Sequence, residues 1–359
     1  MLALQRSGSA CTDTGWSPSV FTLHRDGQLH AACAGYLKSH SYGEYVFDWA
    51  WAEAYERHGL PYYPKLLAAV PFTPVPGARL LALDDQARIA LIKALEQSAR
   101  SSGLSSAHVL FVDETDAAAL KSQGWMLRHG VQFHWQQETE QPLESFEDLL
   151  ARMHRDKRKK IQQERRKVAQ AGVSFRALKG REISEDWWDF FHACYSITYR
   201  QHRSTPYLTR AFFSEMAAHM SENWLLFVAQ LGEKPVACSL IALDPQRRVA
   251  YGRYWGATTH IPCLHFEACY YQPLAWCIEN HYQRFEGGAQ GEHKMARGLL
   301  PVGTTSAHWI GDARFADAVD DFLKREGAHV DAYVDELRER TPFKANPLSS
   351  ADDDALSGP

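Results

Sequence analysis

Hydrophobic and polar positions change their period several times along the chain. Residues 84–103 read DDQARIALIKALEQSARSSG, with apolar positions at helical spacing, acids at the start and a glycine at the end. Acids in the first turn and glycine after the last turn both favour a helix. The run AHVLFVD at 107–113 is short and almost continuously apolar, which is typical of a buried strand. The first 140 residues therefore predict alternating strands and helices.

A second series of elements follows a polar junction that contains Pro142. The pattern predicts helices and a strand, and then strand pairs in 224–243 and 247–258. A helix at 264–281 leads into a strand at 284–288, and an amphipathic helix ends near residue 340. Because both halves show the same order of elements, we expect two domains of one architecture.

The expected fold class is α/β, with two domains that each carry a mixed central sheet flanked by helices. We expect an N-terminal domain at 1–140 and a C-terminal domain at 141–341. The remaining segment, 342–359, is rich in Pro, Ser and Asp, so we expect a disordered tail. No sequence repeat accompanies the common order of elements, and the duplication is inferred from the pattern alone.

Composition narrows the class of protein. Of the 359 residues, 45% are hydrophobic and 23% are charged, which is typical of globular proteins. No apolar run approaches the roughly 20 residues that span a bilayer, and the N-terminus lacks the pattern of a signal peptide. The seven cysteines include no C-x-x-C pair. We therefore expect reduced thiols, a cytoplasmic location and no metal site.

Positive charge concentrates in one segment. Residues 152–167 hold nine Lys or Arg and two acids, so this segment carries +7 and the rest of the chain −11, against a total of −4. Two interpretations are open: a solvated helix face, or a surface that contacts the phosphates of coenzyme A or of a tRNA acceptor stem. The candidate donor-phosphate residues are Lys157, Arg158, Lys159 and Lys160.

Several stretches carry a family resemblance. They include HSYGEYVFDWAWAEAYERHGLPYYPKL at 40–66, LLFVAQLGEKPVACSLIAL at 225–243 and RFEGGAQGEHKMARGLLP at 284–301. Together they resemble the FemAB-like acyltransferases, which belong to the wider GNAT (acyl-CoA N-acyltransferase) fold. More narrowly, the chain is similar to a subgroup connected with peptidoglycan biosynthesis. The resemblance covers roughly residues 16 to 340.

The resemblance implies tandem GNAT-like domains and an N-acyltransferase. The donor would be acyl-CoA or aminoacyl-tRNA, with no tightly bound cofactor, and the acceptor a primary amine on a small molecule or a cell-wall precursor. Direct transfer needs a base, donors for the oxyanion and a proton for the leaving group, but no covalent enzyme intermediate. The sequence accordingly has no G-x-S-x-G, and it has no P-loop or G-x-G-x-x-G. The alternative is a non-catalytic protein of this fold that recognises a cell-wall precursor or a protein partner.

The stretch RFEGGAQGEHKMARG at 284–298 is the first candidate for chemistry. Its glycines let a ligand approach the backbone, and its charged residues offer binding and proton transfer. Lys294 also lies where FemAB-like proteins resemble one another, and we expect a catalytic role for it. A tight turn with solvated charges is the alternative. The substrate-binding candidates of this stretch are Glu286, Gln290, Glu292, His293 and Arg297.

Two further stretches of the second half are candidates. RYWGA supplies Arg253, Tyr254 and Trp255, which could clamp a substrate carboxylate or phosphate. CLHFEACYY places His265 and Glu267 near a helix start, where Glu267 could act as a base or hold an ammonium group and His265 could shuttle protons. Packing and capping roles are the alternatives.

The first half offers a polar and aromatic set, which we expect to be exposed and to suit acceptor recognition. The stretches SHSYGEYVFDW and PYYPK supply its members. For each residue taken alone, a structural role is the alternative. The substrate-binding candidates here are Tyr42, Glu44, Asp48, Tyr63 and Lys65.

Overall fold

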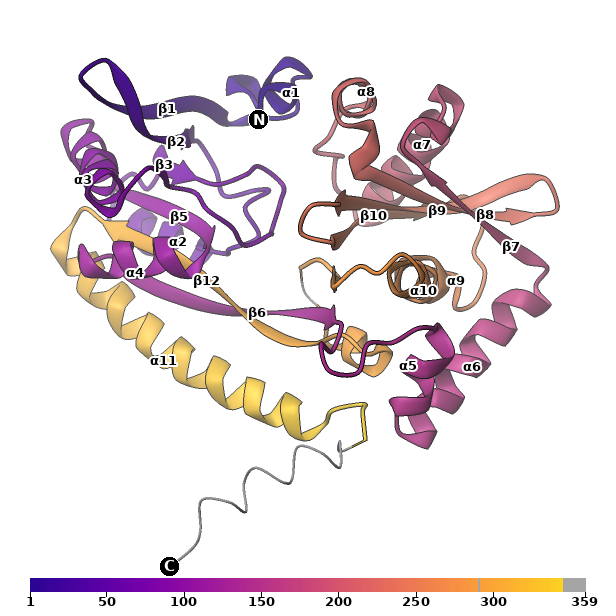
Figure 1. Ribbon diagram of the computed structural model, residues 1–359. Helices are drawn as coiled ribbons and strands as arrows, with labels where there is room; N and C mark the ends of the chain where they lie inside the picture. The colour runs from indigo at the N-terminus through magenta and orange to yellow at the C-terminus, as the bar shows by residue number, and fades with distance from the viewer. Residues whose placement is uncertain (290, 345–359) are drawn as a thin grey trace, which may run out of the picture. The chain divides into compact units, whose positions relative to one another are not determined.

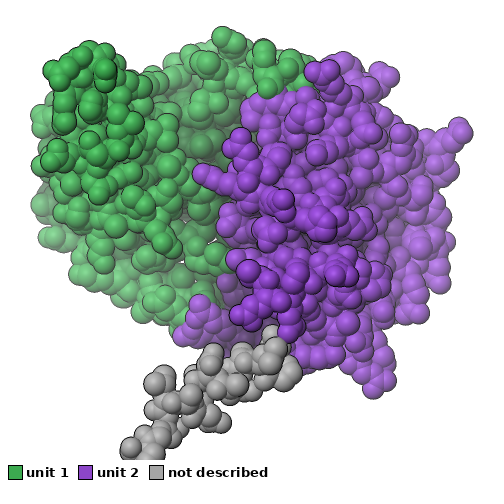
Figure 2. Space-filling model, viewed as in Figure 1, with its two compact units in different colours: residues 1–132, 205–219, 302–334 green, residues 133–204, 220–301, 335–359 purple. Residues whose placement is uncertain are grey.

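A computed structural model describes residues 1–289 and 291–344. The chain has a mixed α/β fold with two compact units, coloured separately in Figure 2. Unit 1 comprises residues 1–132, 205–219 and 302–334, and unit 2 comprises 133–204, 220–301 and 335–359. Within the described residues, no helix is both long enough and apolar enough to cross a lipid bilayer.

These units differ from the continuous domains expected at 1–140 and 141–341. The difference has a physical reason: the strand that ends at Ile310 pairs antiparallel with residues 106–112, far away in the sequence. Strand pairing, not chain order, therefore assigns residues 302–334 to unit 1. The disorder expected from residue 342 is wrong for residues 342–344, because Phe343 forms a β-bridge with Met153 and His154 donates its backbone N–H to the carbonyl of Pro342. The rest of that tail, 345–359, lies outside the described residues.

Unit 1 is built on the strand order β1-β2-β3-β5-β12-β6, with β4 beside β2. The strand pairs β1–β2, β2–β3 and β5–β12 are antiparallel, whereas β3 and β5 are parallel. The strands are β1 (Trp16–Arg25), β2 (Gln28–Lys38), β3 (Lys65–Ala68), β4 (Leu81–Ala82), β5 (Ser106–Val112), β6 (Met126–Gln136) and β12 (Leu300–Ile310). The helices are α1 (Leu2–Arg6), α2 (Trp49–Arg57), α3 (Asp85–Ser101), α4 (Glu114–Ser122), α8 (Arg210–His219) and α11 (Ala313–Glu339).

The two faces of the unit 1 sheet carry different cores, because side chains alternate along a strand. On one face, Ala107 and Val109 of β5 pack with Leu91 and Leu95 of α3. Ile310 of β12 joins another apolar cluster, in which α2 and α11 take part. Ser106 and His108 of β5 and His308 of β12 are polar and buried, and they belong to a polar cluster inside the unit.

Unit 2 follows the order β11-β10-β9-β8-β7, and β11 pairs antiparallel with residues 134–136 of β6, which also belong to unit 2. In Figure 1, α7 and α10 lie on opposite faces of its strands. Its strands are β7 (Val173–Lys179), β8 (Trp224–Leu231), β9 (Lys234–Asp244), β10 (Val249–Ala257) and β11 (Arg284–Glu286). Its helical segments are α5 (Phe146–Arg152), α6 (Arg155–Gln170), α7 (Glu185–Gln201), α9 (Leu264–Phe266), a π-helical turn (Glu267–Tyr271), α10 (Gln272–Glu279) and the 3₁₀ helix η5 (Glu292–Arg297).

Most of the predicted helices and strands are present, and their ends lie within a few residues of the predicted ends. Two features differ. The helix expected at 264–281 contains the π-helical turn, which gives it a different hydrogen-bond pattern at its centre. The glycine-rich stretch after β11, expected as a loop, contains η5. Both differences lie at the candidate site.

Candidate functional site

Strands β10 and β11 separate in the centre of unit 2. They pair in parallel over the residue pairs from Val249–Arg284 to Tyr251–Glu286. After this point β11 ends, whereas β10 continues to Ala257 along β9. A register shift between Gly252 and Tyr254 marks a β-bulge at the same place. Bulges re-aim side chains and are common beside active sites.

Two cavities lie where the strands separate. The smaller, of about 120 Å³, is lined by residues of β9 and β10, by the π-helical turn and by Gly287. The larger, of about 380 Å³, is lined by residues of α7 and by the segment from Trp255 to Phe266. Trp255 and His265 line both. The structure therefore places Arg253, Tyr254, Trp255 and His265 around one hollow region.

The His265 imidazole is held among aromatic rings. Its ring centroid lies 5.3 Å from that of Trp255 and 5.7 Å from that of Tyr270, both edge to face. Burial lowers the pKa of His265 to about 4, and the neighbouring His293 and Arg297 add to the effect. This imidazole is therefore neutral at pH 7 and keeps a lone pair that can accept a proton.

A tyrosine connects this region with an exposed histidine. The hydroxyl of Tyr270, which lines the smaller cavity, lies 3.1 Å from Nε2 of His293. His293 is exposed, and burial lowers its pKa. The pair forms a hydrogen-bonded path between the cavity wall and solvent. Sequence reasoning named His293 but not Tyr270, which only the helical geometry brings into position.

The side chain of Lys294 turns back onto its own loop. Its Nζ donates hydrogen bonds to the carbonyls of Gly288 (2.9 Å) and Ala289 (3.3 Å), and the residue is 3% exposed. A Cβ at Gly287 would lie 3.0 Å from Cδ of Lys294, so glycine there leaves room for the lysine. Burial lowers the pKa of Lys294 to about 8. Gly287 lines the smaller cavity, but Lys294 lies behind it and is not among the lining residues.

Arg297 belongs to a buried network instead of an open site. Its guanidinium donates to both carboxylate oxygens of Glu164 at 3.2 and 3.1 Å and lies 3.5 Å from the ring centroid of Phe266. Tyr271 donates its hydroxyl hydrogen to the same carboxylate. This network ties α6, η5 and the π-helical turn together. Glu164 was missed by sequence reasoning, although a lone acid between basic residues is a signal for such an ion pair.

The remaining loop candidates have different surroundings. Glu286 is buried, forms an ion pair with Arg284 at 3.0 Å, and has a pKa raised to about 7 by burial. Glu292 is exposed and forms an ion pair with Arg340 at 3.1 Å. Gln290 lies outside the described residues. The structure thus does not gather these candidates into one site.

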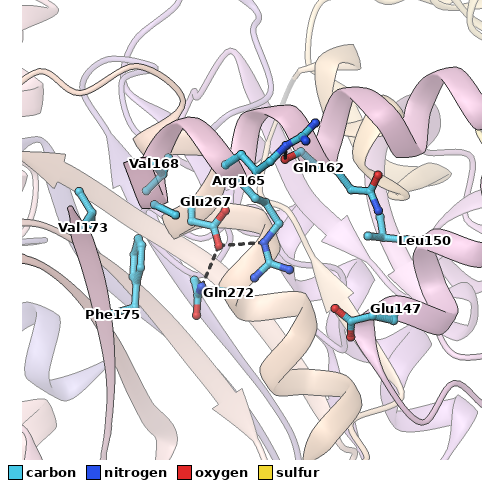
Figure 3. A pocket seen from close by; sticks show the side chains of 11 residues that line it. Glu147, Leu150, Gln162, Arg165, Val168, Val173, Phe175, Glu267 and Gln272 are labelled. Carbon is cyan, nitrogen blue, oxygen red and sulfur yellow. Dashed lines mark hydrogen bonds and ion pairs between the residues drawn. The ribbon is translucent and has the colours of Figure 1, made fainter. Parts of the chain in front are cut away.

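Glu267 lines a different pocket from His265. This pocket of about 720 Å³ lies between α5, α6, β7 and the helix formed by α9, the π-helical turn and α10, here called the broken helix (Figure 3). Arg165 and Arg166 of α6 line it, but the predicted phosphate residues 157–160 do not. Those four residues lie one to two turns earlier on α6 and are exposed or partly exposed. A phosphate-binding role for them stays a prediction.

Four of the five unit 1 candidates, all except Tyr42, belong to a closed polar cluster centred on Lys65, which is fully buried. Its Nζ donates to Ser41 Oγ at 2.7 Å and Glu44 Oε2 at 2.8 Å, and also to Asp48 Oδ2. Lys65 protrudes on the polar face of β3, while the neighbouring Leu66 joins the apolar core. These carboxylates raise the pKa of Lys65 against the opposing effect of burial.

Histidines extend this cluster. His108 Nδ1 lies 2.7 Å from His308 Nδ1, so one imidazole donates and the other accepts. His108 Nε2 lies 2.8 Å from Ser106 Oγ, and Tyr62 donates its hydroxyl hydrogen to Asp48 at 2.7 Å. Burial lowers the pKa of His108 to about 3 and that of His308 well below its usual value. Both rings are therefore neutral at pH 7.

The expectation of an exposed recognition set is wrong for three of the five unit 1 candidates. Glu44 and Asp48 are 4% and 3% exposed, and Lys65 is fully buried. The reason is that pairing of β3 with β2 and β5 places Lys65 on the inner face. Tyr63 is partly buried and bonds to Ser41 at 2.9 Å, whereas Tyr42 is 58% exposed. Among the described residues no group of His, Cys, Asp and Glu could hold a metal ion.

Comparison with known proteins identifies the family. A family model described as FemAB-like, peptidoglycan biosynthesis/recognition, matches residues 1–345. The chain belongs to the FemAB-like family. A search of curated proteins finds no match. The description of the family connects it with the biosynthesis or recognition of peptidoglycan.

Solved structures show the same fold at low sequence identity. The C-terminal domain of a putative lysylphosphatidylglycerol synthetase from Agrobacterium fabrum aligns with a TM-score of 0.53 and 10% identity, over 86% of this chain and 89% of that one. L-PGS from Bacillus licheniformis has a TM-score of 0.52 and 12% identity, over 85% and 89%. FemX has a TM-score of 0.50 and 11% identity, over 86% and 92%. The mixed α/β fold expected from the sequence is confirmed, and these structures share it.

Proposed function

We propose that this FemAB-like protein is an N-acyltransferase that moves an acyl or aminoacyl group from acyl-CoA or aminoacyl-tRNA to a primary amine. The observation that carries the proposal is the neutral imidazole of His265 in the hollow where β10 and β11 separate. The family and the fold support the reaction type. A cytoplasmic location, where such donors are made, is part of the proposal.

The proposed reaction is a direct transfer. The amine nitrogen attacks the carbonyl carbon, a C–N bond forms, and the C–S or C–O bond of the donor breaks. His265 accepts the proton that leaves the amine and passes it to the departing sulfur or oxygen, so no covalent enzyme intermediate is formed. Trp255 and Tyr254 supply apolar walls that exclude water from the reacting groups.

The acceptor is proposed to be an amine on a small molecule or a cell-wall precursor. The family description supports this choice. Lys294 is proposed to act on the loop and not on the reacting atoms, because its Nζ donates to two loop carbonyls. A tRNA partner is proposed only for the aminoacyl-tRNA form of the reaction.

The test is a coupled binding and turnover assay. Purified protein is offered acyl-CoAs and charged tRNA with a panel of primary amines, and the release of free thiol or uncharged tRNA is followed. His265→Gln should lower kcat by roughly 10²- to 10⁴-fold, the usual contribution of a general base. His154→Gln is the matched control, because this exposed histidine makes no side-chain capping bond at the start of α6.

The outcomes separate the two functional classes. Wild-type turnover in a folded His265→Gln protein would remove His265 from the mechanism. Donor binding without turnover by the wild-type protein, across the whole panel, would favour the alternative of a non-catalytic protein that recognises a cell-wall precursor or protein partner. Thermal melting of each variant shows whether the fold is intact.

A further inference from the structure

The pocket beside α6 has no part in the proposed transfer. Neither His265 nor Lys294 lines it, and its walls come from α5, α6, β7 and the broken helix (Figure 3). Its volume of about 720 Å³ lies within the range of roughly 300–1,000 Å³ for small-molecule sites. The pocket therefore has the size of a binding site in its own right.

A buried carboxylate with an unused oxygen lies in the wall of this pocket. Glu267 is 4% exposed. Its Oε1 accepts hydrogen bonds from Nε2 of Gln272 at 2.7 Å and Nε of Arg165 at 3.2 Å. In the described part of the chain, its Oε2 has no hydrogen-bond partner. A buried, unsatisfied carboxylate oxygen is costly. Protein atoms cover this oxygen, so a ligand donor reaches it only when a side chain of the wall moves, and the new hydrogen bond then removes that cost.

The neighbouring guanidinium offers the opposite chemistry. Arg165 uses Nε for Glu267, and its guanidinium carbon lies 4.7 Å from the ring centroid of Phe146. Within residues 1–289 and 291–344, its two terminal nitrogens have no hydrogen-bond acceptor. Its side chain is 30% exposed. Two such nitrogens form a fork that fits a carboxylate in a bidentate manner.

We propose that this pocket binds the head group of an α-amino acid with an apolar side chain. Nε of Arg165 and Oε1 of Glu267 form an ion pair of 3.2 Å. The terminal nitrogens of Arg165 and the Oε2 atom of Glu267 could therefore bind an anion and a cation that lie close together. An α-amino acid carries both on one carbon atom. The ammonium group binds Glu267 and the carboxylate binds Arg165.

The remaining walls select the side chain and disfavour other ligands. Val168, Val173 and Phe175 give the pocket an apolar side, against which an aliphatic or aromatic side chain packs. Glu147 and Glu267 balance the charges of Arg165 and Arg166 in the pocket wall, so the wall has no excess of positive charge for a polyanion such as a phosphate chain. A simple carboxylic acid leaves Glu267 without its donor, and a simple amine leaves Arg165 without its acceptor.

Calorimetric titration of the full chain with L-phenylalanine tests the site. Phenylalanine amide, which lacks the carboxylate, and N-acetylphenylalanine, which lacks the ammonium group, are the two comparison ligands. Each should bind at least about 10-fold more weakly than phenylalanine, because each loses a charge-assisted hydrogen bond. Equal affinity for all three compounds, or no heat of binding for phenylalanine at about 10 mM, would overturn the proposal.

Variants locate the binding in this pocket. Glu267→Gln and Arg165→Gln should each weaken phenylalanine binding by about 10-fold or more. Arg165→Lys keeps the charge but lacks the fork, so it should also bind more weakly. Lys167→Gln is the matched control, since it removes a charge from an exposed position of the same helix outside the pocket. Unchanged affinity in a folded Arg165→Gln protein would place any binding elsewhere.

Discussion

Two buried lysines show how different the candidate regions of the two units are. Lys65 of unit 1 is in contact with two carboxylates, and its pKa is raised. Lys294 of unit 2 is almost as buried, but it donates to two backbone carbonyls, and its pKa is lowered to about 8. A lysine held by carboxylates is fixed as a cation. A lysine held by carbonyls alone can lose its proton near neutral pH.

The two regions also differ in how open they are to solvent and ligands. The Lys65 cluster is closed, and its ionisable groups mainly bond to one another. The region around His265 adjoins two cavities and an exposed histidine. We infer that substitutions in the cluster change stability, whereas substitutions around the cavities change turnover. Variants of each region can test this division.

The largest expected effect is on the stability of unit 1. Lys65→Met leaves Glu44 and Asp48 buried without a cation, and breaking a buried ion pair in this way costs about 3–5 kcal/mol. Urea unfolding measures the loss. The triple variant Lys65→Met, Glu44→Gln, Asp48→Asn removes the unpaired charge and should recover part of it. A Lys65→Met protein as stable as the wild type would show that the cluster does not hold the unit together.

Next in size is an effect of pH on stability. His108 has a pKa of about 3 in the folded chain, against roughly 6.5 when unfolded. Below pH 6.5 the unfolded chain therefore binds more protons, and stability falls as pH falls from 6.5 toward 3. Between pH 7 and pH 5, this one histidine should account for about 1–2 kcal/mol.

The measurement compares urea unfolding at pH 7 and pH 5. Other groups also titrate: Glu44, with a pKa raised to about 7, works in the opposite direction over this interval. The difference between variants isolates the histidine. His108→Gln should lose less stability on acidification than the wild type, and His24→Gln, at an exposed position, should behave as the wild type does. Equal acid sensitivity in all three would mean that His108 is not held neutral.

In the cavity region the expected effect is on turnover. Lys294→Ala removes the two hydrogen bonds that fix the Gly288–Ala289 backbone beside the cavity. A charge-assisted bond contributes on the order of 1.5–3 kcal/mol, so turnover should fall roughly 10- to 150-fold. Steady-state kinetics with the donor and amine that support turnover measures the effect, with thermal melting as the control for folding. Wild-type rates in a folded Lys294→Ala protein would show that the stretch at 284–298 is only a turn, with no role in catalysis.

The two regions also differ in how far the sequence predicts them. The almost continuously apolar run AHVLFVD predicts a buried strand, but it does not predict that His108 and the preceding Ser106 lie in one cluster with His308. That cluster depends on the pairing of β5 with β12, about 200 residues away in the chain. Polar residue types in HSYGEYVFDW suggested an exposed surface, because no local pattern reports that Lys65 provides a buried partner.

In unit 2 the glycines after β11 were expected to let a ligand approach the backbone, and that stays a prediction. What the structure shows at Gly287 is a close approach of other chain segments. A Cβ at Gly287 would lie 2.6 Å from Cδ2 of Leu299. The sequence also singled out His265 and Glu267, two positions apart. It could not show that they line different pockets. The π-helical turn starts at Glu267, and it directs the side chains of the following residues differently from a regular α-helix.

The smallest expected effect belongs to charges that are neither enclosed nor beside a cavity. Lys157, Arg158, Lys159 and Lys160 occupy the first turns of α6 and have substantial solvent contact. Exposed charges of this kind contribute about 0–1 kcal/mol each. A single change to Gln should therefore leave the melting temperature unchanged and weaken donor binding by no more than about fivefold.

A joint substitution sharpens this last prediction. If the four residues bind donor phosphates, changing all of them to Gln should also flatten the dependence of donor affinity on salt, because each phosphate that is no longer neutralised removes about 0.7–0.9 from the slope of log K against log salt. Lys93→Gln with Lys121→Gln, at exposed positions of unit 1, is the control for a general change in charge. An unchanged affinity and an unchanged slope would make the start of α6 a solvated helix face, which binds no donor.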